Sequence, residues 1–321
     1  MNEAIQGGSR KPQLSVGVFA HNHEDFIAEC LDSLQTRTPF QLVITDDGSQ
    51  DETRRVIQER MEQLPLNGVP VLTTLDVNNR GFVARLNDFL EVVSGEWFVL
   101  LSGDDRFAEG ALDRLMRVAE AHPDVDVIFS RFGRIDSEGN EIVERGAEKR
   151  YRDLGRRFCS PGNPLLSLLG QGSFVAGGCT FVRNEFVRRH QIRFDASLTN
   201  AEDYDFWMEC ASKGASFLYV DERCWDHRVL ATSKYYSAGS ERLRSELATI
   251  GRHRVGLPLT HRLGGLIWGV QKWKSQFIVR RSDVVSVREA SELLHTTPSA
   301  ILLSLPVVAL QGIYRRIKRW N

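Results

Sequence analysis

The sequence predicts an α/β protein with a doubly wound, mostly parallel sheet and a C-terminal helical extension. Short apolar runs alternate with segments in which apolar residues recur every three or four positions, as strands and helices do when they alternate along a chain. The run at 97–101 is continuously apolar, which is typical of a strand buried on both faces. Beyond residue 240 the strand-like runs stop and a helical pattern interrupted by glycines continues.

The first 130 residues supply five predicted strands and four predicted helices. The strands are Leu14–Ala20, Gln41–Thr45, Val69–Leu75, Trp97–Leu101 and Val125–Ser130. The helices between them are Glu24–Gln35, Asp51–Leu64, Phe82–Val93 and Ala108–Ala121. In the first helix, Phe26, Cys30 and Leu34 recur at the helical period and mark its buried face.

After residue 130 the pattern becomes less regular. Arg131–Arg145 is predicted to be a hairpin with its turn at Ser137–Asn140, and the polar, Arg-rich segment Lys149–Pro164 a mobile loop. The remaining predicted elements are a strand at Phe174–Arg183, helices at Asn184–His190 and Ala201–Lys213, and a strand at Phe217–Val220. We therefore divide the chain into a tail at 1–12, an α/β domain at 13–236 and a basic helical extension at 237–321.

Charge is spread unevenly along a chain whose composition is that of an ordinary soluble protein. The 321 residues carry a net charge of −1, which gives no overall signature of nucleic-acid binding. Residues 242–321 nevertheless hold 14 Lys and Arg against 4 Asp and Glu. This asymmetry predicts that the extension faces an anionic surface, such as a membrane or a lipid-linked phosphate.

The most apolar window of the chain lies within 299–321. It is shorter than the ~20 residues that span a bilayer, so a helix that lies on the membrane surface is one interpretation. The other, which we slightly favour, is an amphipathic helix packed on its own domain or on a homodimer partner. The N-terminus has no apolar signal region, and five cysteines without a Cys-x-x-Cys pair indicate reduced thiols. We expect a cytoplasmic protein that is peripheral on the inner face of the membrane.

Paired acids follow two of the predicted strands. Asp46-Asp47 follows the strand at 41–45, and Asp104-Asp105 follows the strand at 97–101. Ligands of open α/β sheets bind beyond the carboxyl ends of the strands, so both pairs are expected at one edge. Adjacent carboxylates repel each other unless a cation shares the site, and a divalent ion that bridges to a diphosphate is a common solution. A solvated turn with Asp as a helix N-cap is the alternative interpretation.

At these residues the chain resembles a known family, the family 2 glycosyltransferases of GT-A fold. The motifs occur in the family's order, over roughly residues 14–230. They read SVGVFAHNHEDFIAECLDSL, VITDDGSQDET, NNRGFVARLNDFL, FVLLSGDD, GGCTFVRNE and AEDYDFWMECASKG.

The resemblance implies a role for each matching residue. Asp47 matches the acid that binds the nucleotide base, and Asp105 the direct metal ligand. Asp203 matches the catalytic base, and Glu202 would orient Asp203 or the acceptor. The residues implied to bind the nucleotide-sugar are Ala20, Asn22, Asp47, Asn79, Gly81, Asn87 and Asp104, of which Asp104 is also implied at the metal.

Three segments depart from the family's pattern. Ser102 stands where many relatives have an acid, so metal binding would depend more on the diphosphate. Arg85 is displaced by one position from the family's arginine, which puts a diphosphate role for it in doubt. His227 and Arg228 replace a Tyr-Arg-x-His-like segment, and for His227 we favour a surface loop histidine. His21 and His23 are expected to line the pocket.

These observations predict an inverting transferase. It would move a sugar from a nucleoside diphosphate, with a UDP-sugar slightly favoured, to a hydroxyl of a glycan or lipid-linked acceptor. Mg²⁺ or Mn²⁺ would stabilise the leaving diphosphate, and one carboxylate would accept the acceptor's proton in a single displacement. The rivals are a nucleotidyltransferase, for which the loop after residue 20 is neither Gly-rich nor basic, and a non-catalytic sugar-nucleotide-binding module, which the Ser102 departure keeps open.

Overall fold

Two compact units make up the described part of the chain. The computed structural model describes residues 12–63, 69–143, 145–158, 164–171, 174–198, 200–230, 239–255, 257, 259–279 and 286–305. The first unit is drawn from 1–153, 176–193 and 216–229, and the second from 154–175, 194–215 and 230–321. The second unit thus takes in two segments, 154–175 and 194–215, that the sequence assigns to the α/β domain.

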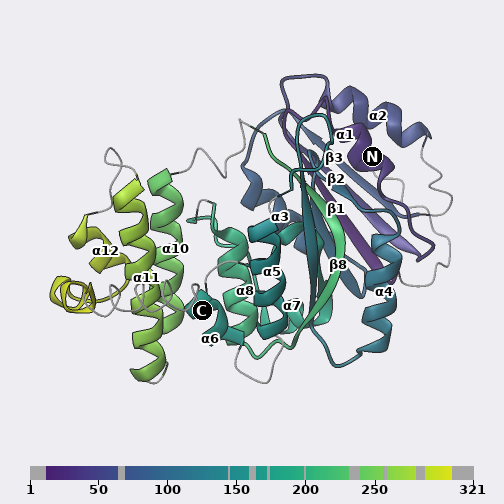
Figure 1. Cartoon of the computed structure of the whole chain (residues 1–321). Helices are drawn as coiled ribbons and strands as arrows, with labels where there is room; N and C mark the ends of the chain where they lie inside the picture. Colours follow the sequence, from purple (N-terminus) through teal and green to yellow (C-terminus); the bar gives the residue numbers. More distant parts are fainter. Residues whose placement is uncertain are drawn as a thin grey trace. The chain divides into compact units, whose positions relative to one another are not determined.

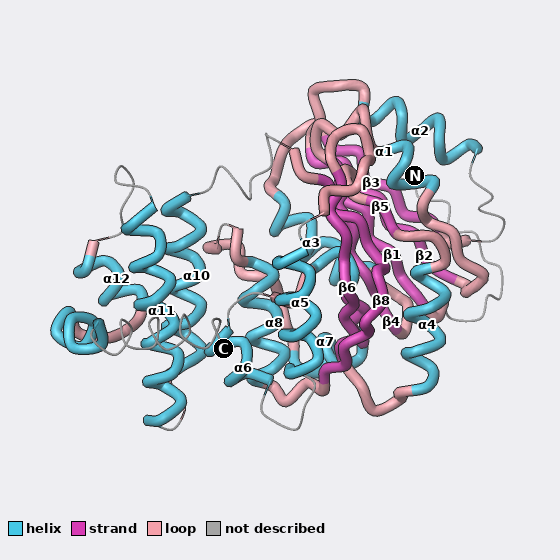
Figure 2. The backbone as a smooth tube through the Cα atoms, viewed as in Figure 1, coloured by secondary structure: helices cyan, strands magenta, loops and turns pink. Residues whose placement is uncertain are grey.

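The first unit is built on one mixed, mostly parallel sheet, as predicted (Figure 2). Its strand order is β3-β2-β1-β4-β7-β6-β8-β5. Pairing is parallel from β3 to β4 and between β6 and β8, whereas β7 is antiparallel to both neighbours and β5 is antiparallel to β8. The strands are β1 Leu14–Ala20, β2 Phe40–Asp47, β3 Val71–Asp76, β4 Trp97–Ser102, β5 Arg106–Phe107, β6 Val127–Ile135, β7 Thr180–Arg183 and β8 Phe217–Arg228.

Helices cover both faces of the parallel half of this sheet (Figure 1). The helices within the first unit are α1 Ile27–Asp32, α2 Thr53–Gln63, α3 Phe82–Val92, α4 Ala111–Ala121 and α7 Asn184–His190, with a 3₁₀ turn η1 at Gly177–Cys179. Helix α5, Arg145–Phe158, has residues in both units. The second unit contains α6 Pro164–Gln171, α8 Glu202–Ser212, α10 Gly239–Arg254, α11 Leu259–Val279 and α12 Val287–Leu293.

The alternation of side chains along β1 explains why it is apolar throughout. Val16 and Val18 point into the core cluster that α1 and α4 complete, with Leu115 of α4 among its members. Phe19 points to the other face, where its ring meets that of Phe89 of α3 at 6.0 Å. A strand covered on both faces must bury every residue, and all seven residues of β1 are buried.

Three predicted elements between residues 131 and 183 differ from the structure. The mobile loop at Lys149–Pro164 is wrong for 149–158, which belong to α5, because Tyr151, Leu154 and Phe158 recur at helical spacing among the arginines. The hairpin at Arg131–Arg145 is reduced to a turn closed by the single bridge Ile135–Glu141. Of the predicted strand at Phe174–Arg183, Thr180–Arg183 forms strand β7 and Gly177–Cys179 a 3₁₀ turn.

The last strand is longer than predicted. The sequence marks only Phe217–Val220, but β8 continues to Arg228 and stays paired with β6 through a register shift near Arg131. Its second half buries Cys224, Trp225 and Asp226 in succession and continues with His227 and the buried Arg228, so charged and polar residues interrupt the apolar signal of a strand. This extension carries residues 225–228 to the sheet edge where β4 ends.

Close packing against β8 makes Gly178 sensitive to substitution. A Cβ atom at Gly178 would lie 2.4 Å from Trp225 Cε2, whereas one at the neighbouring Gly177 would meet no atom within 4 Å. Trp225 is itself packed in the core. We expect Gly178→Ala to lower the free energy of unfolding by ~1–3 kcal/mol, a typical cost of overpacking. Gly177→Ala is the matched control, and chemical denaturation that gave equal stabilities would contradict the prediction.

None of the helices in the described ranges is long and apolar enough to cross a membrane. Residues 298–305 are helical. The rest of the 299–321 window, from 306 onward, lies outside the described residues, so the membrane contact of this window stays a prediction.

Candidate active site

The carboxyl ends of β2, β1 and β4 meet at one edge of the sheet. Ala20 of β1 is in register with Asp46 of β2, and Phe19 with Ser102 of β4. The chain runs from β1 outward to β2 and β3 and then returns to β4 on the other side of β1. Such a reversal of strand order opens a crevice beyond the strand ends, and ligands of α/β sheets bind there. The two predicted acidic pairs therefore share an edge, as expected.

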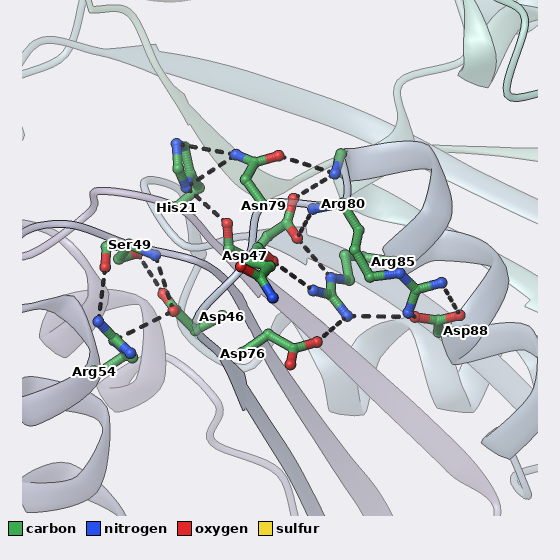
Figure 3. A network of polar contacts seen from close by, with 12 residues as sticks. His21, Asp46, Asp47, Ser49, Arg54, Asp76, Asn79, Arg80, Arg85 and Asp88 are labelled. Atoms are coloured by element: carbon green, nitrogen blue, oxygen red, sulfur yellow. Dashed lines mark hydrogen bonds and ion pairs between the residues drawn. The ribbon is translucent and has the colours of Figure 1, made fainter.

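Asp47 lies at this edge and is almost fully engaged by the protein (Figure 3). Its Oδ1 accepts hydrogen bonds from the backbone N–H of Arg80 at 2.8 Å and from Nε of Arg85 at 2.7 Å. Its Oδ2 accepts from the N–H of Gly81 at 2.8 Å. Burial alone would raise the pKa of Asp47, but these donors together hold it below its usual value. Asp47 is therefore an ionised, acceptor-only group.

The neighbouring acid, Asp46, has a different task. It is completely buried and accepts hydrogen bonds from the N–H and hydroxyl of Ser49, which closes the turn after β2. Ser49 Oγ in turn accepts from the N–H of Asn22 at 2.9 Å. Asn22 adopts a left-handed conformation, φ 56°, and its Oδ1 accepts from Gln50 N. Asp46 and Asn22 thus bind the turns after β1 and β2 to each other.

The predicted segment from 79 to 87 borders the same edge. Asn79 Oδ1 accepts from the N–H of Gly81 at 3.0 Å, and Asn79 Nδ2 lies 3.3 Å from Nε2 of His21. Gly81 has φ 89°, a conformation that favours glycine, and it precedes α3. Asn87 lies farther along α3 and is half-buried. Ala20, His21 and Asn79 thus lie near Asp47 at this edge of the sheet.

The second acidic pair sits in the turn after β4. Asp105 is 3% exposed, and its Oδ1 accepts from the N–H of Arg228 at 2.8 Å and lies 3.3 Å from Nδ1 of His227. Asp104 is half-buried, and its carbonyl accepts from Nε of Arg228 at 2.8 Å. The preference for a surface loop histidine at 227 is wrong, because the extension of β8 carries His227 against Asp105.

Arg228 connects this turn to two other segments. It is 1% exposed, donates to the carbonyls of Asp136 and Ser137, and pairs with Glu29 of α1. A buried guanidinium has five donors in a fixed geometry, and here they hold the Asp104-Asp105 turn to its surroundings. Its role is thus to position the acidic turn.

Asp203 and Glu202 start α8 in the second unit. Burial and the adjacent charge of Glu202 raise the pKa of Asp203 to about 7, against the opposing hydrogen bond from the N–H of Tyr204. Farther along α8, the buried Asp205 pairs with His253 and Arg252 of α10. These ion pairs fix the helix that carries Asp203 to the basic extension.

The comparisons with known proteins decide the family. The model of the family described as "Glycosyl transferase family 2" matches residues 15–190, more than half of the chain. The chain belongs to glycosyltransferase family 2. The match spans β1 to α7 and therefore contains Asp47 and Asp104-Asp105.

Relatives and solved structures agree with this membership. An uncharacterized glycosyltransferase of Methanocaldococcus jannaschii is 22% identical over 235 residues, which cover 72% of this chain and 76% of the relative. The chain covers 65% of two rickettsial relatives, just under two thirds of their length.

Two solved structures share the GT-A fold. Staphylococcus aureus TarS 1–349, solved with UDP-GlcNAc, has a TM-score of 0.62 and 19% identity, with 82% of this chain and 73% of TarS covered. The mannosyltransferase PcManGT of Pyrobaculum calidifontis, solved with GDP-Man and Mn²⁺, has a TM-score of 0.60 and 17% identity, with 96% and 88% covered.

The acidic turn of this glycosyltransferase suits a divalent cation only if a ligand completes the site. Within the described ranges, no cluster of three or more His, Cys, Asp or Glu side chains could hold a metal ion alone. Burial raises the pKa of Asp105 to about 6, and contact with His227 opposes that rise. A buried carboxylate of this kind gains from a cation. Mg²⁺ is commonly bound by one or two carboxylates together with substrate phosphates, and Asp104 and Asp105 could supply the carboxylates of such a set.

Proposed function

We propose that this glycosyltransferase uses a nucleoside-diphosphate sugar as its donor. The observation that carries the proposal is the arrangement at the switch point of the sheet. There the ionised Asp47 and the Asp104-Asp105 turn lie beyond strands on either side of β1. A nucleoside-diphosphate sugar needs a hydrogen-bond acceptor that binds its base. It also needs acidic side chains that bind the metal ion associated with its diphosphate. The sugar nucleotides bound to TarS and PcManGT support the same class of donor, with a UDP-sugar favoured here.

We assign Mg²⁺ or Mn²⁺ to Asp105 and Asp104. Asp105 would be the direct ligand and Asp104 the contact to the sugar or ribose, with diphosphate oxygens completing the shell. When bound there, the cation would act as a Lewis acid that stabilises the charge of the leaving diphosphate. Arg228 donates from its N–H to the carboxylate of Asp105 and from Nε to the backbone carbonyl of Asp104, so the Asp105 carboxylate and the backbone of the turn are held before the donor arrives.

Asp203 is proposed as the catalytic base and Glu202 as the residue that orients it or the acceptor. A base with a pKa of about 7 is ionised in a large fraction of molecules at neutral pH and still accepts a proton readily. The acceptor oxygen would form a bond to the anomeric carbon as the bond to the diphosphate breaks, and its proton would pass to Asp203. One base without a protein nucleophile implies inversion.

We propose a glycan or a lipid-linked molecule as the acceptor, with 299–321 as a peripheral contact to an anionic membrane. The excess of Lys and Arg over 242–321 supports this proposal. Co-sedimentation with vesicles that contain anionic lipid is expected for the full chain and should be lost when 299–321 is deleted. A packed helix or a homodimer contact in that segment would instead leave sedimentation unchanged and alter the melting temperature or the oligomeric state.

The donor assignment is tested by thermal shift with UDP, dTDP, GDP and CDP, each with and without Mn²⁺. A ligand that binds only the native state raises the melting temperature according to its concentration and affinity. A shift with one nucleotide that grows with Mn²⁺ is expected. If no nucleotide produces a shift, the proposed donor class is wrong, and a chain that keeps the fold without binding a donor becomes the better interpretation.

A further inference from the structure

The buried arginine of α3, Arg85, lies beside Asp47 at the edge of the sheet where β1, β2 and β4 end (Figure 3). Its side chain is 2% exposed. It donates from Nε to Asp47 Oδ1 at 2.7 Å and pairs through Nη1 with Asp76 Oδ2 at 2.7 Å. Its Nη2 donates to the carbonyl of Asn78 at 3.2 Å. Arg85 therefore joins the ends of β2 and β3 to α3.

These contacts make a role for Arg85 at the diphosphate difficult. A guanidinium has five N–H donors, and in Arg85 all three nitrogen atoms already have protein partners. Withdrawing it toward a substrate would leave Asp47 buried without its cation, which is costly. Arg85 stands one position away from the family's arginine in the sequence. In this structure it binds Asp47 and Asp76 instead of being free to contact a diphosphate.

The contacts also define what Asp47 can still bind. An ionised carboxylate offers about four acceptor positions. Two on Oδ1 are occupied by Arg80 N and Arg85 Nε, and one on Oδ2 by Gly81 N. One position on Oδ2 remains, and only a hydrogen-bond donor can use it.

We propose that Arg85 is a positioning residue that fixes Asp47 so that its remaining acceptor position meets a ring N–H of the nucleotide base. This inference rests on the proposed sugar-nucleotide function and specifies the base that the site selects. Uracil and thymine carry a ring N–H at N3, and guanine at N1. Cytosine has a lone pair at N3, which a carboxylate repels, and its donor on that edge is the exocyclic 4-amino group rather than a ring N–H. The proposed contact to a ring N–H therefore favours UDP, dTDP or GDP over CDP.

The charges around Asp47 support this role. Asp76, Asp88 and Asp46 are negative groups nearby, and Arg85, Arg80 and Arg54 are the positive ones, while His21 Nδ1 contacts the backbone carbonyl of Asp47. Burial raises the pKa of Asp47 and the hydrogen bonds from Arg80, Arg85 and Gly81 lower it. Without Arg85, protonation of Asp47 should extend to higher pH, and a protonated carboxyl is a poorer acceptor.

The test is calorimetric titration of the full chain with UDP, or with whichever of the four nucleotides the wild type binds, plus Mn²⁺. We expect Arg85→Met to raise Kd by ~10–100-fold, the range for a hydrogen bond to a charged group. The ratio of variant to wild-type Kd should be larger at pH 5.5 than at pH 7.5, and in that ratio titration of the nucleotide's own phosphates cancels. In Arg85→Lys the ratio of variant to wild-type Kd at pH 5.5 should lie closer to 1 than in Arg85→Met, because lysine keeps the positive charge but lacks the planar guanidinium group. In turnover, KM for the donor should rise while kcat changes little.

Leu90→Ala is the matched control, since it removes a buried side chain of the same helix that, being apolar, takes no part in the hydrogen bonds of the Asp47 carboxylate. It should lower the melting temperature and leave Kd unchanged. An Arg85→Met or Arg85→Lys protein with wild-type Kd at both pH values would overturn the inference, as would a Kd ratio independent of pH. A wild type that binds no nucleotide would instead refute the proposed function, and the inference with it.

Discussion

Replacing Asp203 by Asn is expected to lower kcat for sugar transfer by ~10²–10⁴-fold, the usual contribution of a general base. Nucleotide affinity should stay within about twofold of the wild type, because binding of the donor is assigned to the other acidic groups. The amide keeps the shape of the side chain and cannot accept the proton of the acceptor hydroxyl. Steady-state turnover and calorimetry on the same preparation separate the two quantities.

The pH dependence gives this prediction a second readout. The base acts when ionised, so kcat of the wild type should rise as pH increases through about 7, the pKa to which burial and Glu202 raise Asp203. That limb should be absent from Asp203→Asn. In Glu202→Gln it should move to lower pH, since the charge of Glu202 contributes to the raised pKa. Asp205→Asn, in the same helix, is the control for lost stability and should keep the limb near pH 7. A limb that persists in Asp203→Asn would assign the base to another residue.

Replacing Asp105 by Asn is expected to remove the Mn²⁺-dependent part of the thermal shift and to lower turnover at least ~10²-fold, since the charge that develops on the leaving group loses its counter-ion. The shift produced by the nucleotide alone should remain, because Asp47 is untouched. Differential scanning fluorimetry with a titration of Mn²⁺ measures both effects in one experiment.

Asp126→Asn is the matched control for this change. Asp126 accepts hydrogen bonds from the N–H and hydroxyl of Ser216 where β6 and β8 begin, at the end of these strands opposite to Arg228. It should lower the melting temperature and leave the response to Mn²⁺ intact. Equal Mn²⁺ responses in Asp105→Asn and in the wild type would exclude Asp105 as a metal ligand.

The parallel half of the sheet could be predicted because the sequence pattern that marks a strand lies within that strand. Strands β1 and β4 are apolar runs, the acids of β2 are its last two residues, and Asp104 and Asp105 come within three residues of the end of β4. A buried parallel sheet fixes both the apolar pattern and the edge at which polar residues gather. Asp47 and Asp105 could therefore be placed at the same edge of the sheet from the sequence alone.

The groups that hold these acids could not be predicted in the same way. His227 and Arg228 belong to a strand whose second half is polar, so neither periodicity nor hydropathy marks it. Arg85 shows no sign in the sequence that it is buried, because a buried arginine depends on partners such as Asp76 that only the fold supplies. The prediction of a loop where α5 forms was wrong for a related reason, since the charged residues of α5 conceal the helical spacing of Tyr151, Leu154 and Phe158.

The hydrogen bond between Arg228 and Asp105 joins residues 123 positions apart. Strands β1 to β4, at whose edge Asp47 lies, are all synthesised by residue 102. Asp104 and Asp105 come within three residues of the end of β4, but the buried Arg228 that contacts them is synthesised only with the end of β8. During translation the chain therefore contains every strand at the Asp47 edge well before the residue that holds Asp104 and Asp105 in place.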